Sequence, residues 1–191
     1  MKDKRSLLTK IVLVLGVLLV LAAAALLIYF KVSEKNYKTD NASAVSFIES
    51  VIPETEPGVI ENRSNPVMPA FEFEGEDYIG IFEYERFGVK LPVKSRWSKR
   101  AAKYTPCLFT GSAYDGSIVI GGGFDFVADT DIGDTVRLTD MKGNYYTYKV
   151  ASVKHSKNAS KETLCEGEFD LTFFARSSET KDYIIVRCNV G

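Results

Sequence analysis

An uncharged apolar run near the start of the chain constrains its architecture more than any other feature. Residues 11–30 read IVLVLGVLLVLAAAALLIYF, 20 residues without a charge or a proline. As a helix, such a run is long enough to cross a hydrocarbon core of about 30 Å. Four basic residues precede it against one acidic residue, Asp3. This excess predicts that residues 1–10 stay in the cytoplasm and that the rest of the chain is extracytoplasmic.

A cleaved signal peptide is the alternative interpretation of this run. The apolar core of a signal peptide is usually about 7–15 residues long and is followed by a small-residue cleavage site. Here the alanines at 22–25 lie inside the run, and residues 26–30 continue it with LLIYF. The pattern therefore favours an uncleaved signal-anchor and a single-pass protein of the cell membrane.

Charge and cysteine content exclude several classes of function. The net charge is -1 and no basic stripe stands out, which argues against a nucleic-acid binder. Cys107, Cys165 and Cys188 are too few for a disulfide framework and show no C-x-x-C spacing. With a single histidine, His155, a structural zinc site is not expected.

Residues 31–77 are predicted to hold a short helix and a linker. In 41–52 (NASAVSFIESVI) the apolar residues recur at helical spacing. They are Ala44, Phe47, Ile48, Val51 and Ile52. Asn41 could cap this helix and Pro53 would end it. Residues 53–69 are rich in Pro, Glu, Asn and Ser, as is typical of a linker.

Short strand patterns fill residues 78–191. They are YIGIFEY (78–84), FGVKLPV (87–93), SIVIG (117–121), DTVRLTD (134–140), YYTYKVASV (145–153), DLTFFAR (170–176) and YIIVRCNV (183–190). The fourth and fifth flank residues 141–144, a short loop with Gly143, and predict a β-hairpin. About seven short strands with little helix favour a closed or half-closed β-barrel.

The order of these segments resembles the sortase family of Gram-positive bacteria. YIGIFEYERFGVKLPV is similar to the opening of that family, and SIVIGGGFDF to its segment G-N-V-V-I-A-G-H followed by F. IGDTV (132–136) is similar to L-x-x-G-D-x-I, and YKV (148–150) to Y-x-V. DLTFFAR is similar to the strand end L-T-L-x-T-C, and YIIVRC to the last strand R-L-I-V-R. The resemblance covers about residues 78–190 and implies an eight-stranded closed β-barrel with short helices.

Sortases cleave a sorting signal in a surface protein and join it to an amine of the cell wall or a pilin. The resemblance therefore implies three chemical roles. A cysteine thiolate attacks the peptide carbonyl and forms a thioester. A histidine supplies a proton to the leaving amine, and an arginine stabilises the oxyanion.

None of the three roles is filled at the matching positions. The histidine falls at Gly123, the cysteine at Arg176 and the arginine at Tyr183. A glycine transfers no proton, and a guanidinium is not a nucleophile at neutral pH. The alignment therefore predicts a sortase-like protein without a catalytic residue.

A site rebuilt from other residues is the alternative. Cys188 is predicted to share a strand face with Val186 and Val190, as a small buried hydrophobe does. Cys165 lies in CEGE, where acidic neighbours disfavour the reactive thiolate. His155 lies in the Lys-rich stretch KHSKNASK, which is typical of a solvated loop.

Neither a metal nor a cofactor is expected. Asp125, Asp129, Asp131 and Asp134 could suggest calcium, but they lack the spacing of an EF-hand loop. A solvated acidic loop is the favoured interpretation. The glycines of GGGFD (121–125) are not followed by G-K-[ST], so they do not form a phosphate loop.

The sequence thus predicts residues 11–30 as a transmembrane anchor and residues 78–191 as a sortase-like barrel. The favoured hypothesis is a catalytically inactive protein that binds a sorting-signal peptide, a surface protein or an active sortase at the cell envelope. A cysteine transpeptidase with a displaced nucleophile is the second hypothesis, and a purely structural envelope β-domain is the third.

Overall fold

The structure, a computed structural model, describes residues 2–60 and 67–191, with side chains of the first helix described from Leu13 onward except at residue 34. Part of the predicted linker, residues 61–66, lies outside the described residues. The chain forms two compact units, residues 1–39 and residues 40–191. Each unit is described by itself.

The helical elements are α1 (Lys2–Val51), η1 (Glu85–Phe87), η2 (Ala101–Lys103), η3 (Val127–Asp129) and α2 (Lys161–Leu164). The strands are β1 (Glu56–Pro57), β2 (Phe71–Phe73), β3 (Glu76–Tyr84), β4 (Val89–Lys94), β5 (Cys107–Thr110), β6 (Ile118–Gly121), β7 (Thr135–Asp140), β8 (Asn144–Ser156), β9 (Leu171–Arg176) and β10 (Tyr183–Val190).

The first unit is helical and apolar. Every residue from Leu13 to Val32 is exposed, although nearly all of them are hydrophobic. By length and composition this part of α1 can cross a membrane. The structure thus bears out an apolar N-terminal helix over the predicted anchor.

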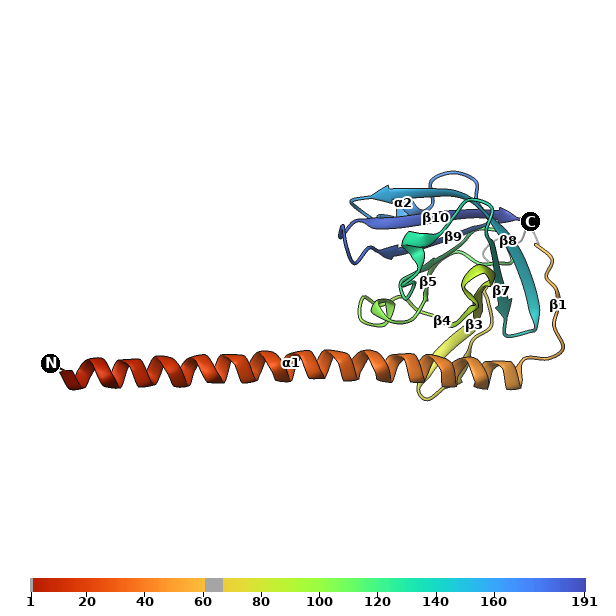
Figure 1. The fold of residues 1–191 in the computed structure, drawn as a ribbon. Coiled ribbons are helices and arrows are strands. Elements are labelled where there is room, and N and C mark those ends of the chain that lie inside the picture. Colours follow the sequence, from red (N-terminus) through yellow and green to blue (C-terminus); the bar gives the residue numbers. More distant parts are fainter. Residues whose placement is uncertain (1, 61–66) are drawn as a thin grey trace. The chain divides into compact units, whose positions relative to one another are not determined.

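In the second unit eight strands close into a barrel. The pairing runs β7-β8-β10-β9-β6-β5-β4-β3, and β3 pairs back to β7. Two short strands lie outside this ring, because β1 adds to β8 and β2 adds to β3. Figure 1 shows β9 and β10 in the upper part of this unit and β3 and β4 below them, with β7 next to β3. The predicted eight-stranded closed barrel is confirmed.

Strand alternation separates the interior of the barrel from its outer face. On β9 the side chains of Leu171, Phe173 and Ala175 join the main core inside the barrel. Phe174, between them, points outward and packs with Val119 of β6. This period of two is what a pleated strand dictates. By the same alternation, Arg176, two residues beyond Phe174, belongs to the outer face.

The predicted helix 41–52 is present but forms the end of α1 rather than a separate element. Ala44, Val45 and Ile48 are buried in one cluster with Tyr78 and Ile81 of β3. Val51, expected on the buried face, is exposed.

The prediction that Asn41 caps this helix is wrong. Asn41 lies within α1 and is buried. Its Nδ2 donates to the carbonyl oxygen of Tyr104 (3.0 Å), and its Oδ1 accepts from the Thr105 hydroxyl (2.7 Å). The amide therefore bonds to a distant loop instead of to the first turn of a helix.

Two further sequence predictions are corrected by the barrel. His155 lies in strand β8, paired with Ile184, and not in a loop. Cys188 is buried with Val186 as predicted, but Val190 is exposed. A register shift between Arg187 and Cys188 interrupts the regular pairing of this strand with β8.

Candidate functional site

The ends of three adjacent strands bring together the positions that the sequence alignment singles out. β9 pairs with β6 in parallel, with Gly121 opposite Phe174, and with β10 in antiparallel, with Arg176 opposite Tyr183. The Gly122 amide donates to the Phe174 carbonyl (2.7 Å), so the chain enters Gly123 beside the end of β9. Gly123, Arg176 and Tyr183 are together called the strand-end site.

Gly123 has no room for a side chain in this conformation. Its φ of +71° is in the left-handed region, and a Cβ built on it would lie 2.6 Å from both the Pro106 nitrogen and the Thr105 carbonyl carbon. Its amide donates to the Ala102 carbonyl (2.9 Å). The glycine is therefore required for close approach to the segment 102–106, as glycine typically is where two backbones meet.

Arg176 and Tyr183 lie on either side of a short turn. The Arg176 Nε donates to the Lys181 carbonyl (2.8 Å), and the Ser177 amide donates to the Asp182 carbonyl (2.8 Å). Arg176 is exposed, and no ion pair among the described residues involves it. Its charged end is therefore available to a ligand.

An aromatic cluster fills the outer face of the barrel next to the strand-end site. The Trp97 ring lies 5.4 Å from that of Phe109 and 5.4 Å from that of Phe174, and the latter two are 5.6 Å apart. The Tyr183 ring is 6.3 Å from that of Phe174. A side chain at Gly121 would collide with Phe174 and Trp97. The first and third glycines of GGG thus allow close packing rather than a ligand cradle.

Two of the three thiols are held in unreactive surroundings. Burial raises the pKa of Cys107 to about 11, and burial also raises the pKa of Cys188. Both side chains are fully buried. Since the thiolate is the nucleophile, neither cysteine is prepared to attack a carbonyl near neutral pH.

The third thiol, Cys165, is exposed and lines a cavity of about 220 Å³. This cavity, called the α2 pocket, lies between the β8–β9 connection and strands β5, β6 and β9. Its lining is Thr110, Gly111, Ser117, Val119, Leu164, Cys165, Glu166, Gly167, Phe169 and Thr172. It combines a thiol with three hydroxyls and one carboxylate, and no histidine is among these residues.

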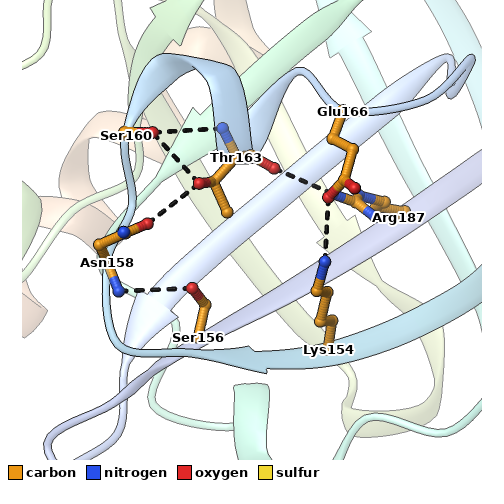
Figure 2. Close-up of polar contacts among 7 residues, drawn as sticks. All are labelled: Lys154, Ser156, Asn158, Ser160, Thr163, Glu166 and Arg187. Carbon is orange, nitrogen blue, oxygen red and sulfur yellow. Dashed lines mark hydrogen bonds and ion pairs between the residues drawn. The ribbon is translucent and has the colours of Figure 1, made fainter.

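Polar contacts fix the connection that carries Cys165. Figure 2 shows Arg187 of β10 reaching the connection, where its Nη2 donates to the Thr163 carbonyl (2.9 Å) and to Glu166 Oε2 (3.2 Å). Lys154 of β8 donates to the same carboxylate oxygen (2.9 Å). The hydrogen bonds from Lys154 and then Arg187 lower the pKa of Glu166. The pocket carboxylate is therefore held ionised by two cations.

The N-terminal side of α2 is fixed by hydroxyl groups. Ser160 Oγ accepts from the Thr163 amide (3.3 Å), as an N-cap does. The Thr163 hydroxyl donates to Asn158 Oδ1 (3.0 Å), and Ser156 Oγ accepts from the Asn158 amide (3.3 Å) (Figure 2). The connection is thus tied down at both ends of α2.

Two carboxylates of the acidic run 125–134 already form ion pairs with an arginine outside the run. Arg86 of η1 donates to the carboxylates of Asp131 and Asp134, and the Tyr84 hydroxyl donates to Asp134. Within residues 2–60 and 67–191, no group of three or more His, Cys, Asp or Glu side chains is arranged to hold a metal ion. The absence of a resident metal stays a prediction.

Motif order predicts the strand-end site but not the α2 pocket. Thr110 of the pocket lining belongs to no motif, and Ser117 belongs to SIVIGGGFDF only as its first residue. The signal available was the unpaired cysteine next to a predicted strand. Nothing local indicated that residues near 110 would meet residues near 165.

The sequence matches no family model and no curated protein. Solved structures of sortases share its fold. A sortase D transpeptidase from Clostridium perfringens has a TM-score of 0.51 at 16% identity, over 60% of this chain and 79% of that chain. Sortase C of the same organism, with the C-terminal cell wall sorting motif, gives 0.52 at 18%, over 61% and 71%. Sortase A of Listeria monocytogenes gives 0.50 at 17%, over 60% and 87%.

Proposed function

We propose that this chain, whose fold is sortase-like, is a membrane-anchored extracytoplasmic protein. It binds a surface-protein peptide or a partner enzyme at the cell envelope and does not catalyse transpeptidation. The observation that carries the proposal is the strand-end site. Arg176 pairs with Tyr183 there, and Gly123 follows Gly122, whose amide donates to the Phe174 carbonyl. The resemblance expects Cys, Arg and His at these three positions.

Each substitution removes one step of the transpeptidase chemistry. Gly123 has no group to protonate a leaving amine, and the backbone of 105–106 occupies the space of a side chain. Arg176 keeps a positive charge in place of a thiolate. Tyr183 is a neutral phenol where a cation would stabilise an oxyanion.

What remains at the strand-end site suits binding. The exposed Arg176 guanidinium has donors that can pair with a carboxylate in two parallel hydrogen bonds. The half-buried ring of Tyr183, which packs on Phe174, and the half-buried rings of Trp97 and Phe109 offer an apolar surface next to that charge. A peptide with an acidic side chain or a free C-terminus fits this combination.

One observation favours a second candidate function, transpeptidation through a displaced nucleophile. Cys165 is exposed and lines a cavity, whereas Cys107 and Cys188 are buried. It has no imidazole among the residues of that cavity. Glu166, the carboxylate beside it, is already engaged by Lys154 and Arg187. The α2 pocket therefore lacks a ready base, and the binding function is the better supported.

The experiment separates binding from chemistry on the same sample. The full-length chain in lipid nanodiscs is incubated with a fluorescent peptide carrying a cell wall sorting motif. Anisotropy reports binding, and intact mass reports an acyl adduct. We expect binding without an adduct, and weaker binding in Arg176→Ala. An adduct that disappears in Cys165→Ala would establish the displaced nucleophile and overturn the inactive assignment.

If Arg176→Ala bound the peptide as well as the unmodified chain does, the strand-end site would not be the binding site. Lys157→Ala, which deletes an exposed cation of the β8–β9 connection, is the matched control. Absence of both binding and adduct with every peptide would favour the purely structural hypothesis.

A further inference from the structure

A basic loop connects β4 and β5. From Arg86 to Tyr114 the sequence contains seven basic residues and no acidic one. Four of these basic residues lie in residues 95–104, which are called the basic loop. The net charge of -1 does not reveal this cluster of basic residues, and the cluster belongs to no motif of the sequence.

The basic loop is held in place by its apolar and small residues. Trp97 packs against Phe109 and Phe174 of the aromatic cluster, and Ala102 is buried. The Ser98 hydroxyl accepts from the Ala101 amide (3.1 Å), and the Ala102 carbonyl accepts from the Gly123 amide. The loop is therefore a fixed part of the barrel surface.

The charged side chains of the loop face outward. Arg96, Lys99 and Arg100 are exposed, and among the described residues none of them takes part in an ion pair. Lys94, at the start of the loop, is different because it pairs with Glu76 (3.0 Å). Within the part of the chain that the structure describes, three cations thus project from this segment without an ion-pair partner.

The number of residues between the apolar run and the basic loop limits how far apart the two can lie. The loop ends at Tyr104, whose carbonyl accepts from Asn41, and Thr105 donates to the same side chain. Asn41 follows Phe30, the end of the apolar run, by 11 residues. That length spans about 16 Å as helix and at most about 40 Å fully extended. A tether of this length allows the basic loop to reach a bilayer that contains the helix.

We infer that the basic loop is a docking surface for the anionic phospholipid headgroups of the membrane in which the chain is anchored. The inference rests on the membrane anchor of the proposed function and not on its peptide binding. Each Lys or Arg near an anionic bilayer is attracted to it, and the attraction is screened by salt. Contact through Arg96, Lys99 and Arg100 would fix the rotation of the barrel about its tether.

The only tryptophan of the chain, Trp97, lies inside the basic loop and reports on this contact. The full chain is placed in nanodiscs of phosphatidylcholine alone or mixed with phosphatidylglycerol, each with a headgroup-spin-labelled lipid. We expect quenching of Trp97 to be about twofold stronger in the anionic discs and to fall to the neutral value in high salt.

A charge-matched pair of variants tests the residues. R96E/K99E/R100E should lose the extra quenching, whereas K149E/K157E/K161E, with the same change in net charge on another part of the barrel, should keep it. Thermal melting establishes that both variants fold. The salt dependence of the unmodified chain decides the question if the first variant does not fold.

Equal quenching in both kinds of disc would overturn the inference while leaving the anchor intact, because co-purification with discs measures the anchor separately. Failure to enter any disc would overturn the anchor and this inference with it. If soluble polyphosphate bound the loop and lipid composition had no effect, the ligand would be an anionic polymer and the lipid assignment would be wrong.

Discussion

The strand-end site and the α2 pocket divide between them what a transpeptidase needs in one place. The strand-end site holds the positions that the family resemblance singles out, but Gly123 is closed off by the backbone of 105–106, and none of the three residues carries a thiol. The α2 pocket has space and a thiol, Cys165, but no imidazole in its lining. The difference teaches that, in a barrel of this kind, the cavity and the exposed thiol can lie away from the strand ends that the motifs single out.

The largest expected effect is in thiol reactivity. At pH 7.5 an alkylating reagent should modify Cys165 about 100-fold faster than Cys107 or Cys188, because the raised pKa of about 11 leaves Cys107 protonated and burial shields it. Raising the pH should speed Cys107 labelling only as the pH approaches 11. Intact-mass time courses on the full chain measure the rates.

Cys165→Ser is the control for that experiment, since it should leave only the slow phase. Fast labelling of this variant would show that a core cysteine is accessible. The contrast between the closed barrel interior and the open α2 pocket would then be wrong.

The next effect is on stability at Gly123. Gly123→Ala should lower the free energy of unfolding by about 1–3 kcal/mol more than Gly133→Ala. Both glycines have positive φ, but a Cβ at Gly133 meets nothing within 4 Å. The difference between the two variants, measured by denaturant unfolding, isolates the steric clash with Thr105 and Pro106. Equal losses would mean that the strand-end site has room for a side chain after all.

A smaller effect is expected at the connection that carries the α2 pocket. Arg187→Met keeps an unbranched apolar stem at this buried position but leaves the Thr163 carbonyl without its donor, at a cost of about 1–3 kcal/mol. Hydrogen exchange in residues 157–170 should increase. Lys154→Met is the control, because its exposed pair with Glu166 contributes about 0–1 kcal/mol. Unaltered exchange in both variants would show that the pocket wall is held by other contacts.

The smallest effect on stability is expected at Arg176. Arg176→Ala should change the free energy of unfolding by less than about 0.5 kcal/mol, because the side chain is exposed and makes one hydrogen bond to the turn. A large loss would mean that Arg176 is a structural residue. Its position at the strand-end site would then say nothing about binding.

Most of the barrel could be predicted because its strands alternate or run apolar over several residues. β5 (Cys107–Thr110) could not, since it has four residues, follows a proline and shows no alternation in its burial. What makes it a strand is its pairing with β6 and a single contact with β4. Such pairing is tertiary, and local residue preferences do not reveal it.

The positions of the strand-end site could be predicted from motif order, whereas its closure could not. The three glycines signalled close approach, but their neighbour, the segment 102–106, is 15 or more residues away in the sequence. Asn41 shows the same limit. An asparagine before an apolar run predicts an N-cap, yet its amide found partners at residues 104 and 105.

The bonds of Asn41 also have a mechanical meaning. Tension along a chain anchored in a membrane enters the second unit at Asp40, one residue before this side chain. The hydrogen bonds of Asn41 to Tyr104 and Thr105 lie close to that point, before the apolar contacts of Ala44 and Ile48 in the sequence. A pull along the helix would therefore load this buried amide, and the segment that it holds is the one packed against Gly123.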